Sequence, residues 1–462
     1  MKDQKDRLLI VGAGLAGAEA ALTAASLGLP VTLIDMKPQE RSPAHTSSHF
    51  AELVCSNSLK SNRPETAQGL LKRELNSLGS ALLAIAEKTA VPAGGSLAVD
   101  RDAFAAAVSD AIDRHPLIQV SCRTIESLEE LFQESRVQLV ATGPLTGGGL
   151  YESIQAFTGA EGLHFFDAVA PIVEASSIDS AQSFMASRYG KGGQDYLNCP
   201  MNREQYLAFR QALLVADRAS VRDFDPTYFK DCQPIEVLAE RGEDTMRFGP
   251  LRPVGLIDPA TGKRPYACLQ LRKEDQAGAM LSLVGCQTRL TFSEQRRVFG
   301  MIPALARAEF LRYGVMHRNS FLQGPLVLGS GFQSRTRRGL FFAGQLTGLE
   351  GYVEAIGSGL VAAIQAAALM KGLDASDMEA LLPSPRTMIG ALASWVTGGA
   401  SLQDFQPMNA NFGLLPMDGE GKKIKKADRA LLRIQESDRE MDRLRSLLKN
   451  YWEDRELMDD QA

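Results

Sequence analysis

The sequence predicts an α/β protein built on a parallel sheet, because an apolar run, a glycine-rich turn and an alanine-rich segment follow one another near its start. Residues 8–11 read Leu-Leu-Ile-Val, which is typical of a buried parallel strand. Residues 18–27 are rich in alanine with helical spacing, and Gly28 marks the end of that helix. A second apolar run covers residues 31–34. We therefore predict a strand–helix–strand unit over residues 7–35.

The first turn of this unit has the spacing G-x-G-x-x-G at Gly12, Gly14 and Gly17. Glycines at this spacing allow a tight turn, close approach of the backbone to a pyrophosphate, and close helix–strand packing. The helix N-terminus would then present N–H groups to the phosphates. Asp35 ends the second strand, where an acidic group favours the ribose hydroxyl of FAD or NAD over the 2′-phosphate of NADP. The alternative is an ordinary turn, with Asp35 capping the next one.

Composition sets the broad class of the protein. A chain of 462 residues has room for two or three domains, and 45% hydrophobic residues support a large core. The net charge of −5 gives no overall attraction to nucleic acid or to an anionic membrane. The charged N-terminus lacks the apolar region of a signal peptide, and no uninterrupted apolar run of about 18 residues indicates a membrane span. We expect a cytoplasmic protein without a membrane partner.

The cysteines are scattered and never form C-x-x-C, which argues for reduced cytosolic thiols and against disulfides or a zinc site. No metal is expected. Cys55 lies in a long loop, residues 36–60, which we expect to be ordered over the nucleotide site because it contains Phe50, Leu53 and Val54. A free cysteine is usually a small buried hydrophobic residue, so the pattern alone does not assign Cys55 a function.

Later segments repeat the strand-and-helix pattern. We expect a helix over residues 70–85, a strand over 137–143 where the chain returns to the nucleotide-binding domain, and a strand over 339–345 that runs into a glycine turn. An alanine-rich helix over 355–370 follows, and its N-terminus would point at the cofactor. The predicted divisions are a nucleotide-binding domain in two parts, 1–186 and 320–420, an inserted domain at 187–319, and a helical tail at 421–462.

Arginines outnumber acids between residues 289 and 318. Two interpretations remain open for this excess. It can be a solvated face, or a surface that contacts phosphates and binds them with salt-dependent affinity. The arginines are Arg289, Arg296, Arg297, Arg307, Arg312 and Arg318.

Seven groups of motifs lie along the chain, at residues 11–17, 51–58, 91–95 with 100–101, 232–236, 248–256, 313–319, and 342–345 with 350–354. Taken together, these motifs resemble the TrmFO family, the folate- and FAD-dependent tRNA (uracil-5-)-methyltransferases of bacteria. The resemblance covers nearly the whole chain. The glycine-rich ends are also similar to the tRNA-modifying flavoprotein GidA (MnmG), but the Cys55 segment and the short tail differ from it.

The resemblance implies a Rossmann-like FAD-binding domain of the GidA and glutathione reductase type, with an inserted α+β domain and C-terminal helices. It also implies a reaction in which 5,10-methylenetetrahydrofolate supplies one carbon, FAD carries it, and NAD(P)H re-reduces the flavin. The acceptor would be C5 of the T-loop uridine, position 54, of tRNA. The alternatives are an FAD-dependent oxidoreductase and a GidA-like tRNA-modifying flavoprotein. The oligomeric state is not predicted.

Uracil C5 becomes a nucleophile only after a thiolate adds at C6, and a base must later remove the C5 proton. The resemblance implies that Cys55 and Cys232 do this work. We favour Cys55 as nucleophile and Cys232 as general base, with the reverse assignment left open. The resemblance further places His317 and Tyr352 in the folate and flavin pocket. The expected cofactor-binding residues are Gly12, Ala13, Gly14, Leu15, Ala16, Gly17, Asp35, His317, Gly344, Gln345, Glu350, Gly351 and Tyr352.

Overall fold

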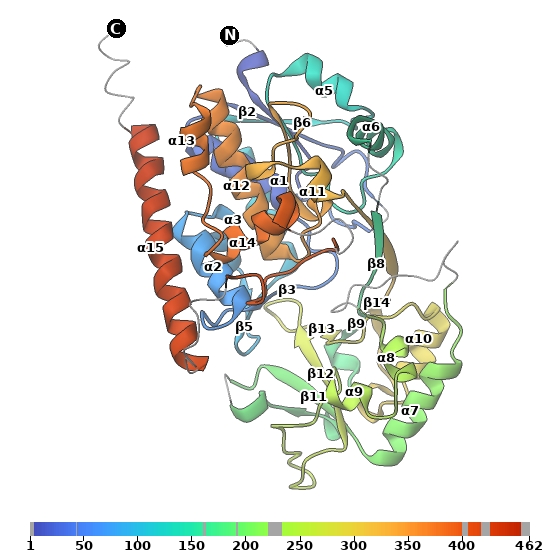
Figure 1. The fold of residues 1–462 in the computed structure, drawn as a ribbon. Helices are drawn as coiled ribbons and strands as arrows, with labels where there is room; N and C mark the ends of the chain where they lie inside the picture. Colours follow the sequence, from blue (N-terminus) through green and yellow to red (C-terminus); the bar gives the residue numbers. More distant parts are fainter. Residues whose placement is uncertain are drawn as a thin grey trace.

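The computed structural model contains two lobes, a larger one around a parallel sheet and a smaller one around an antiparallel sheet, with a long helix along one side of the larger lobe (Figure 1). At residues 4, 163–168, 317–318, 426–427 and 453 it describes the backbone only. The described residues are 4–42, 44–159, 163–190, 193–219, 233–399, 405–416 and 426–453.

The parallel sheet of the larger lobe has the order β16-β7-β1-β2-β6, and all its neighbours run parallel. This arrangement confirms the predicted α/β fold. Strands β1, β2, β7 and β16 are almost wholly buried, as their largely apolar sequences predict. The bounds are Leu8–Val11 for β1, Val31–Asp35 for β2, Ile118–Cys122 for β6, Gln138–Val140 for β7 and Leu340–Phe342 for β16.

Helices α1, Leu15–Ser26, and α12, Tyr352–Met370, pack against each other in the core of this lobe. Gly359 permits the contact, because a Cβ atom there would lie 2.1 Å from the carbonyl oxygen of Ala16. Helix α12 is long and apolar enough to cross a membrane, but 89% of its apolar window is buried inside the protein. It is therefore packed as a core helix.

Two predicted boundaries differ from the structure. The helix expected over 70–85 is two helices, α2, Ala67–Ser77, and α3, Ala81–Lys88. The break follows from Gly79, which has φ +81°, and from Ser80, whose hydroxyl accepts a hydrogen bond from the Leu83 N–H and so starts a new helix. Helix α12 begins before the expected residue 355, because Gly351 serves as its N-cap.

The smaller lobe contains a six-stranded sheet of order β10-β11-β12-β13-β9-β14 with antiparallel neighbours. Its first strand, β9, starts at Ile172, ahead of the expected boundary at 187, because β9 pairs with β13 and β14. The bounds are Ile172–Glu174 for β9, Phe184–Met185 for β10, Tyr196–Met201 for β11, Ala267–Lys273 for β12, Met280–Leu283 for β13 and Phe310–Arg312 for β14.

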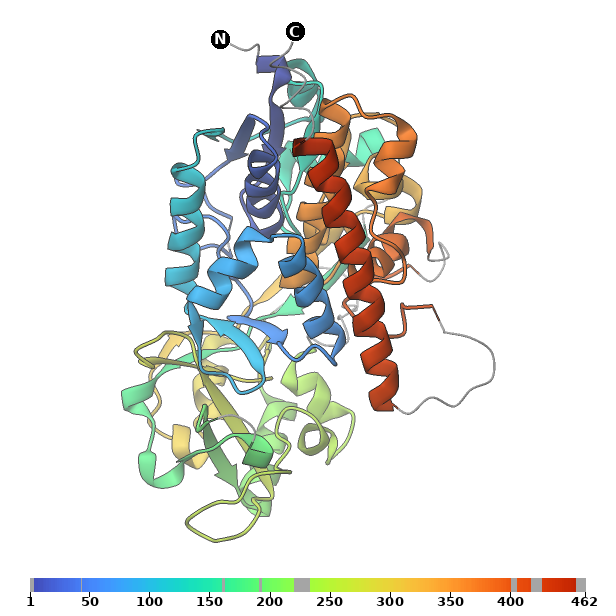
Figure 2. The same cartoon turned by 90° about the vertical axis from the view of Figure 1, so that its left-hand side faces the viewer.

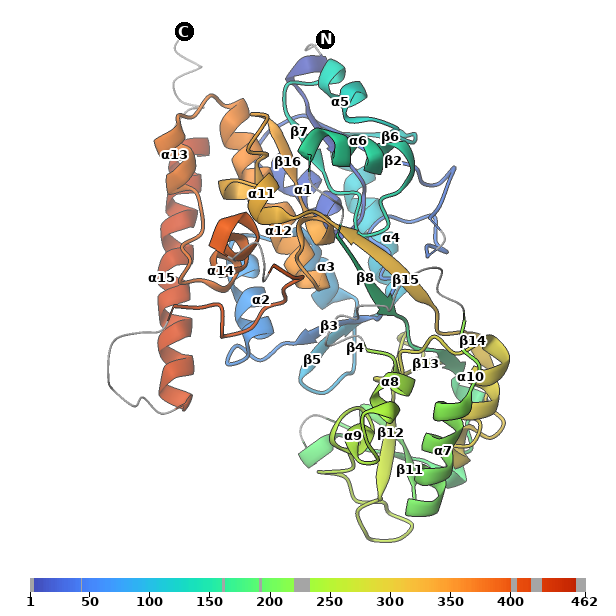
Figure 3. The same ribbon diagram turned by 45° about the vertical axis from the view of Figure 1, so that its right-hand side comes forward.

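Helices cover the antiparallel sheet, and a two-stranded ribbon connects the lobes. The ribbon pairs β8, Leu163–Ala168, with β15, Met316–Phe321, and it runs between the lobes in Figure 3. The helices of this lobe are α7, Arg203–Val215, α8, Ile235–Glu240, α9, Thr245–Phe248, and α10, Phe292–Phe299.

Smaller elements complete the larger lobe. Strands β3, Ser58–Ser61, β5, Ser96–Val99, and β4, Ala90–Val91, form a three-stranded sheet next to the inserted lobe. The remaining helices of this lobe are α4, Arg101–Asp113, α5, Leu128–Glu134, α6, Gly148–Thr158, α11, Gly324–Val327, α13, Ala375–Ala380, and α14, Met388–Ser394.

The C-terminal helix α15, Lys426–Glu453, lies along the larger lobe (Figure 2) and falls within the predicted helical tail. Met441 and Leu444 are its most deeply buried apolar side chains. Arg73 on α2 donates to both carboxylate oxygens of Asp438, at 2.7 and 2.9 Å. Apolar burial and this ion pair hold the helix on the body.

Candidate active site

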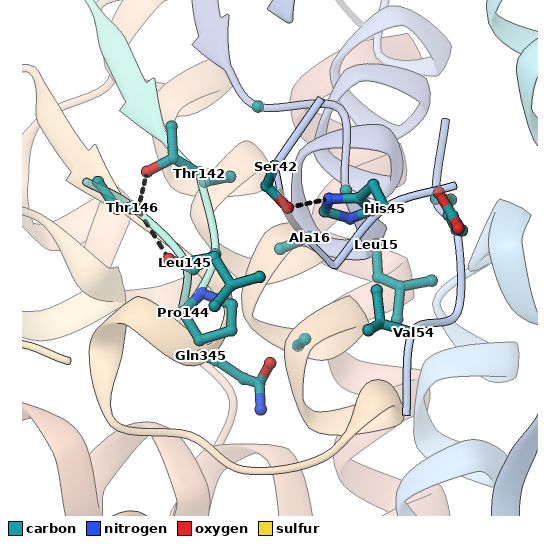
Figure 4. Close-up of a pocket in the computed structure, with 18 of the residues that line it drawn as sticks. Leu15, Ala16, Ser42, His45, Val54, Thr142, Pro144, Leu145, Thr146 and Gln345 are labelled. Atoms are coloured by element: carbon teal, nitrogen blue, oxygen red, sulfur yellow. Dashed lines mark hydrogen bonds between the residues drawn. The ribbon is translucent and has the colours of Figure 1, made fainter. Parts of the chain in front are cut away.

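A cavity of about 530 Å³ opens at the carboxyl ends of the central parallel strands. The glycine turn after β1, the loop after β2, the turn after β7 and the start of α12 all line it. Ligands of open parallel sheets bind at this edge. Figure 4 shows Leu15 and Ala16 at the start of α1, Val54 and the Ser42–His45 pair of the loop, and the Thr142–Thr146 pair after β7 around this space. The loop over residues 36–60 is therefore positioned over the site, as predicted.

The three glycines occupy the three roles that a dinucleotide turn requires. Gly12 has φ +95°, and a Cβ atom there would lie 2.5 Å from the Ala141 carbonyl oxygen. A Cβ atom on Gly17 would lie 1.7 Å from the Gly12 carbonyl oxygen, so this glycine sets the close helix–strand contact. At Gly14, by contrast, no heavy atom of the described residues lies within 4 Å of an added Cβ. The turn is therefore open at the position where a pyrophosphate approaches.

Two helix N-termini meet this cavity. Gly14 is the N-cap of α1 and Gly351 is the N-cap of α12, and a glycine has no side chain with which to accept the first N–H groups of its helix. Anions bind at such N-termini through these N–H groups and the helix dipole. Gln345 and Glu350 also line the cavity, and the Gln345 side chain donates to Glu350 at 2.8 Å. This arrangement fits the diphosphate of FAD.

Asp35 lines the cavity and also holds the turn together. Its carboxylate accepts hydrogen bonds from the Ala13 N–H at 2.6 Å and the Lys37 N–H at 2.8 Å. Asp35 therefore caps the turn that follows β2, as the alternative interpretation of this residue predicts. A ribose contact uses the remaining lone pairs of the same carboxylate and stays a prediction.

Cys55 lies in the cavity wall, half-buried, on a loop held by Tyr352. The Tyr352 hydroxyl oxygen accepts the N–H of Cys55 at 2.8 Å and the N–H of Ser56 at 3.0 Å. Burial, followed by the electrostatic interaction with Cys55, raises the pKa of Tyr352 well above its ordinary value. The phenol therefore stays neutral and keeps its own proton for donation.

Two guanidinium groups contact the Cys55 loop, and a third interacts with Cys55 electrostatically. Arg101 donates to the carbonyl oxygens of Leu53 and Val54 at 2.8 and 3.2 Å, and Arg272 donates to the Ser56 hydroxyl at 2.9 Å. Arg101, Arg272 and Arg312 each interact electrostatically with Cys55. The positive charge of these arginines favours the thiolate of Cys55, and the thiolate is the reactive form of a cysteine.

Hydrogen bonds from the same loop join the larger lobe to the inserted lobe. Asn57 is fully buried, and its side-chain amide donates to the carbonyl oxygens of Val99 and Lys273 at 2.9 Å each, while its oxygen accepts from Arg272 at 2.8 Å. Arg101 also pairs with the buried Glu274 at 2.5 Å. The position of Cys55 therefore depends on strand β12 of the inserted lobe.

The other described cysteines have different surroundings. Cys199, Cys268 and Cys286 are buried, and burial raises the pKa of each, to about 12 for Cys268. Burial thus disfavours their thiolates. Cys122 is half-buried in β6.

Two predicted site residues cannot be placed fully. Cys232 lies outside the described residues. For His317 the structure gives the backbone, in β15 opposite Asp167, but its side chain lies outside the described part. Asn319, two residues further along β15, lines the cavity.

The arginines between 289 and 318 whose side chains the structure describes differ in their surroundings, and the side chain of Arg318 lies outside the described part. Arg312 is half-buried near Cys55, Arg297 pairs with Glu294 at 2.5 Å, and Arg296 and Arg307 are exposed. Sequence reasoning assigned no role to Arg101, Arg272 or Asn57. The motif at residues 100–101 was the only signal for Arg101, and nothing local marked the other two.

Comparison with known proteins gives the family. The family model described as glucose inhibited division protein A matches residues 7–374. A protein of Enterococcus faecalis named "Methylenetetrahydrofolate--tRNA-(uracil-5-)-methyltransferase TrmFO" is 50% identical over 412 residues, covering 89% of this chain and 92% of that protein. One of the same name from Parasynechococcus marenigrum is 48% identical over 460 residues, covering 96% of each.

A solved structure, that of Aquifex aeolicus GidA, has the same fold. It superposes with a TM-score of 0.65 at 16% identity, covering 96% of this chain and 76% of that one. This likeness supports the fold alone, and the sequence relatives above give the closer relationship. The chain therefore belongs to the glucose inhibited division protein A family and, together with these relatives, to the TrmFO proteins within it.

Proposed function

We propose that this protein is a tRNA (uracil-5-)-methyltransferase that uses methylenetetrahydrofolate and FAD, the reaction that its relatives' names describe. Identity of about half over nearly the full length supports the reaction class. The observation that carries the proposal is Cys55, held in the cavity wall by Tyr352 and interacting electrostatically with three guanidinium groups. The substrates are then tRNA, the folate and NAD(P)H. We place the enzyme in the cytoplasm, in line with its scattered, reduced cysteines.

The cavity would hold FAD through the open turn at Gly14, the carboxylate of Asp35 and the N-terminus of α12 at Gly351. Bound FAD would supply reducing equivalents and would carry the one-carbon unit from folate to RNA. The protein itself would bind the diphosphate at the glycine turn and hold the Cys55 loop at the same cavity.

Cysteine chemistry activates the uracil. The thiolate of Cys55 adds to C6, and the electron pair of the C5–C6 bond moves toward O4, so C5 becomes nucleophilic. After C5 has gained its carbon, a base, assigned here to Cys232, removes the C5 proton. Expulsion of the Cys55 thiolate from C6 then restores the ring. The carbon arrives at the oxidation level of a methylene group, and it becomes a methyl group with the two electrons that reduced FAD would supply. Arg101, Arg272 and Arg312 favour the thiolate at both its attack and its departure.

The reaction is tested with labelled methylenetetrahydrofolate, NAD(P)H and tRNA. Label should appear at the T-loop uridine, and unlabelled S-adenosylmethionine should not change its amount. Cys55→Ala and Cys232→Ala should each abolish transfer while flavin remains bound, whereas the matched control Cys122→Ala should retain it. Transfer of label from S-adenosylmethionine instead of folate would exclude the proposal.

The roles of the two cysteines are separated with tRNA that carries 5-fluorouridine at the target. Fluorine cannot leave as a proton does, so the C6–thiolate adduct accumulates. With Cys55 as nucleophile, Cys232→Ala still forms the adduct and Cys55→Ala does not. The opposite result would assign the reverse roles.

An FAD-dependent oxidoreductase with a small substrate is the alternative from another class. It requires neither cysteine and no tRNA, so both cysteine variants would keep full activity with that substrate. A GidA-like flavoprotein would modify tRNA without forming 5-methyluridine. Nucleoside analysis of the treated tRNA distinguishes this second alternative.

A further inference from the structure

The inserted lobe carries a stack of aromatic rings that ends at the surface. Phe292, the first residue of α10, is 55% exposed, and its ring stacks on Tyr313 with centroids 4.7 Å apart and planes at 16°. Tyr313 stacks in turn on Phe310, with centroids 5.4 Å apart and planes at 3°. A single exposed apolar residue is ordinary. A ring stack whose outer member faces solvent leaves a π-face free for another flat ring.

The backbone next to this stack is fixed by a buried amide. Gln295 is fully buried, and its side chain accepts from the Gly314 N–H at 2.7 Å and donates to the Gly314 carbonyl oxygen at 2.8 Å. It also donates to the Leu290 carbonyl oxygen at 2.7 Å. The segments before Phe292 and after Tyr313 are thereby tied together. A stacking partner would therefore bind without the cost of ordering these segments.

Positive charge lies beside the rings. Arg296 donates to the Tyr313 hydroxyl at 2.6 Å, with its guanidinium carbon 6.0 Å from the centre of that ring. Arg296 is exposed, whereas Arg297, the next residue of α10, is paired with Glu294 and adds less charge. Exposed aromatic faces next to guanidinium groups are the chemistry that binds unstacked nucleic-acid bases and their phosphates.

The stack is also continuous with the active site along the chain. Arg312, the residue before Tyr313, interacts electrostatically with Cys55 and Tyr352. Beyond Gly314 the chain enters β15, where Asn319 lines the cavity. One segment thus reaches from the surface rings to the cavity wall.

We propose that the outer face of Phe292, with Tyr313 stacked behind it, forms a stacking platform for an unpaired base of the tRNA outside the catalytic cavity, with Arg296 contacting an adjoining phosphate. This inference rests on the proposed function, because it needs an RNA substrate. It adds a second contact point to the one at the target uridine. A second copy of this chain is the competing occupant of the same rings.

The test compares Phe292→Ala with Phe292→Trp and with the matched control Phe248→Ala. Phe248 is 79% exposed at the end of α9 in the same lobe. At fixed salt, Phe292→Ala should weaken tRNA binding about 5- to 150-fold, the range of one lost base–aromatic stack. Phe292→Trp should bind within about 2-fold of the wild type because it keeps a larger π-face. Phe248→Ala should bind as the wild type does.

Two further readouts separate binding from folding. NAD(P)H oxidation by oxygen, which needs only the flavin site, should be unchanged in Phe292→Ala, and its methyl transfer should show a raised KM for tRNA with kcat retained. Wild-type tRNA affinity in Phe292→Ala, or an equal loss in Phe248→Ala, would overturn the platform. So would dissociation of a dimer by Phe292→Ala with tRNA affinity unchanged. If the wild-type protein itself binds no tRNA, the proposed function fails before the platform is tested.

Discussion

Removing the Tyr352 hydroxyl should loosen the Cys55 loop without unfolding the protein. Tyr352→Phe keeps the ring but leaves the N–H groups of Cys55 and Ser56 without their acceptor. A buried donor left without a partner costs about 1–3 kcal/mol. Because both residues are only half-buried, water can replace part of the loss, so we expect about 1–3 kcal/mol for the pair.

This cost should appear as local opening, since the loop is not part of the sheet core. A change of about 1–3 kcal/mol corresponds to a 5- to 150-fold shift in the opening equilibrium. Amide hydrogen exchange over residues 51–58, measured by mass spectrometry without substrate, should accelerate by that factor. Methyl transfer should fall while flavin content stays unchanged, because the glycine turn does not involve this hydroxyl.

The matched control is Tyr451→Phe. That hydroxyl donates to Asp377 at 2.7 Å, away from the cavity, so the exchange of residues 51–58 should match the wild type. If Tyr352→Phe exchanged at the wild-type rate and kept full turnover, Tyr352 would not position Cys55, and the argument from its two accepted hydrogen bonds would be refuted.

Two further predictions concern the glycine turn and a buried carboxyl. Gly17→Ala should destabilise the apoprotein by roughly 3 kcal/mol or more, because its Cβ would lie 1.7 Å from a carbonyl oxygen. Gly14→Ala should change the free energy of unfolding of the apoprotein by no more than about 1 kcal/mol, but it should lose flavin. Thermal unfolding and flavin absorbance check both, and a stable Gly17→Ala would contradict the packing argument. Burial raises the pKa of Glu74 from 4.5 to about 7, so the folded state keeps a proton that the unfolded chain loses. The contribution of Glu74 to the free energy of unfolding therefore falls as the pH rises from about 4.5 to 7, by up to about 1.4 kcal/mol per pH unit. Urea unfolding at pH 5, 6 and 7 should show this slope reduced in Glu74→Gln; a profile parallel to the wild type would contradict it.

The Glu74 carboxylate also illustrates what sequence reasoning could not reach. It accepts the N–H groups of Met388 and Ile389 at 2.8 and 2.9 Å and the Ser437 hydroxyl at 2.7 Å, so it joins α2 to α14 and α15. Its partners lie more than 300 residues away in the chain. In the sequence, Glu74 is one charged residue in a helix.

The sequence by itself determined the nucleotide-binding half of the site. The geometry of a turn, the start of a helix and the burial of a strand depend on neighbouring residues. The spacing of Gly12, Gly14 and Gly17 was therefore sufficient to predict a tight turn that a pyrophosphate can approach, and the structure has open space at Gly14. Family motifs added Cys55 and Tyr352 as site residues, and the structure brings the two into contact.

Only the tertiary structure decided what surrounds Cys55. Arg272 reaches Asn57 across 215 residues of sequence, and Arg312 comes from an edge strand of the inserted lobe. Sequence spacing reports contacts along a helix or strand, whereas these charges meet because the two lobes pack against each other around the Cys55 loop. Electrostatic interaction depends on distance in space, and for Cys55 the folded chain alone sets that distance.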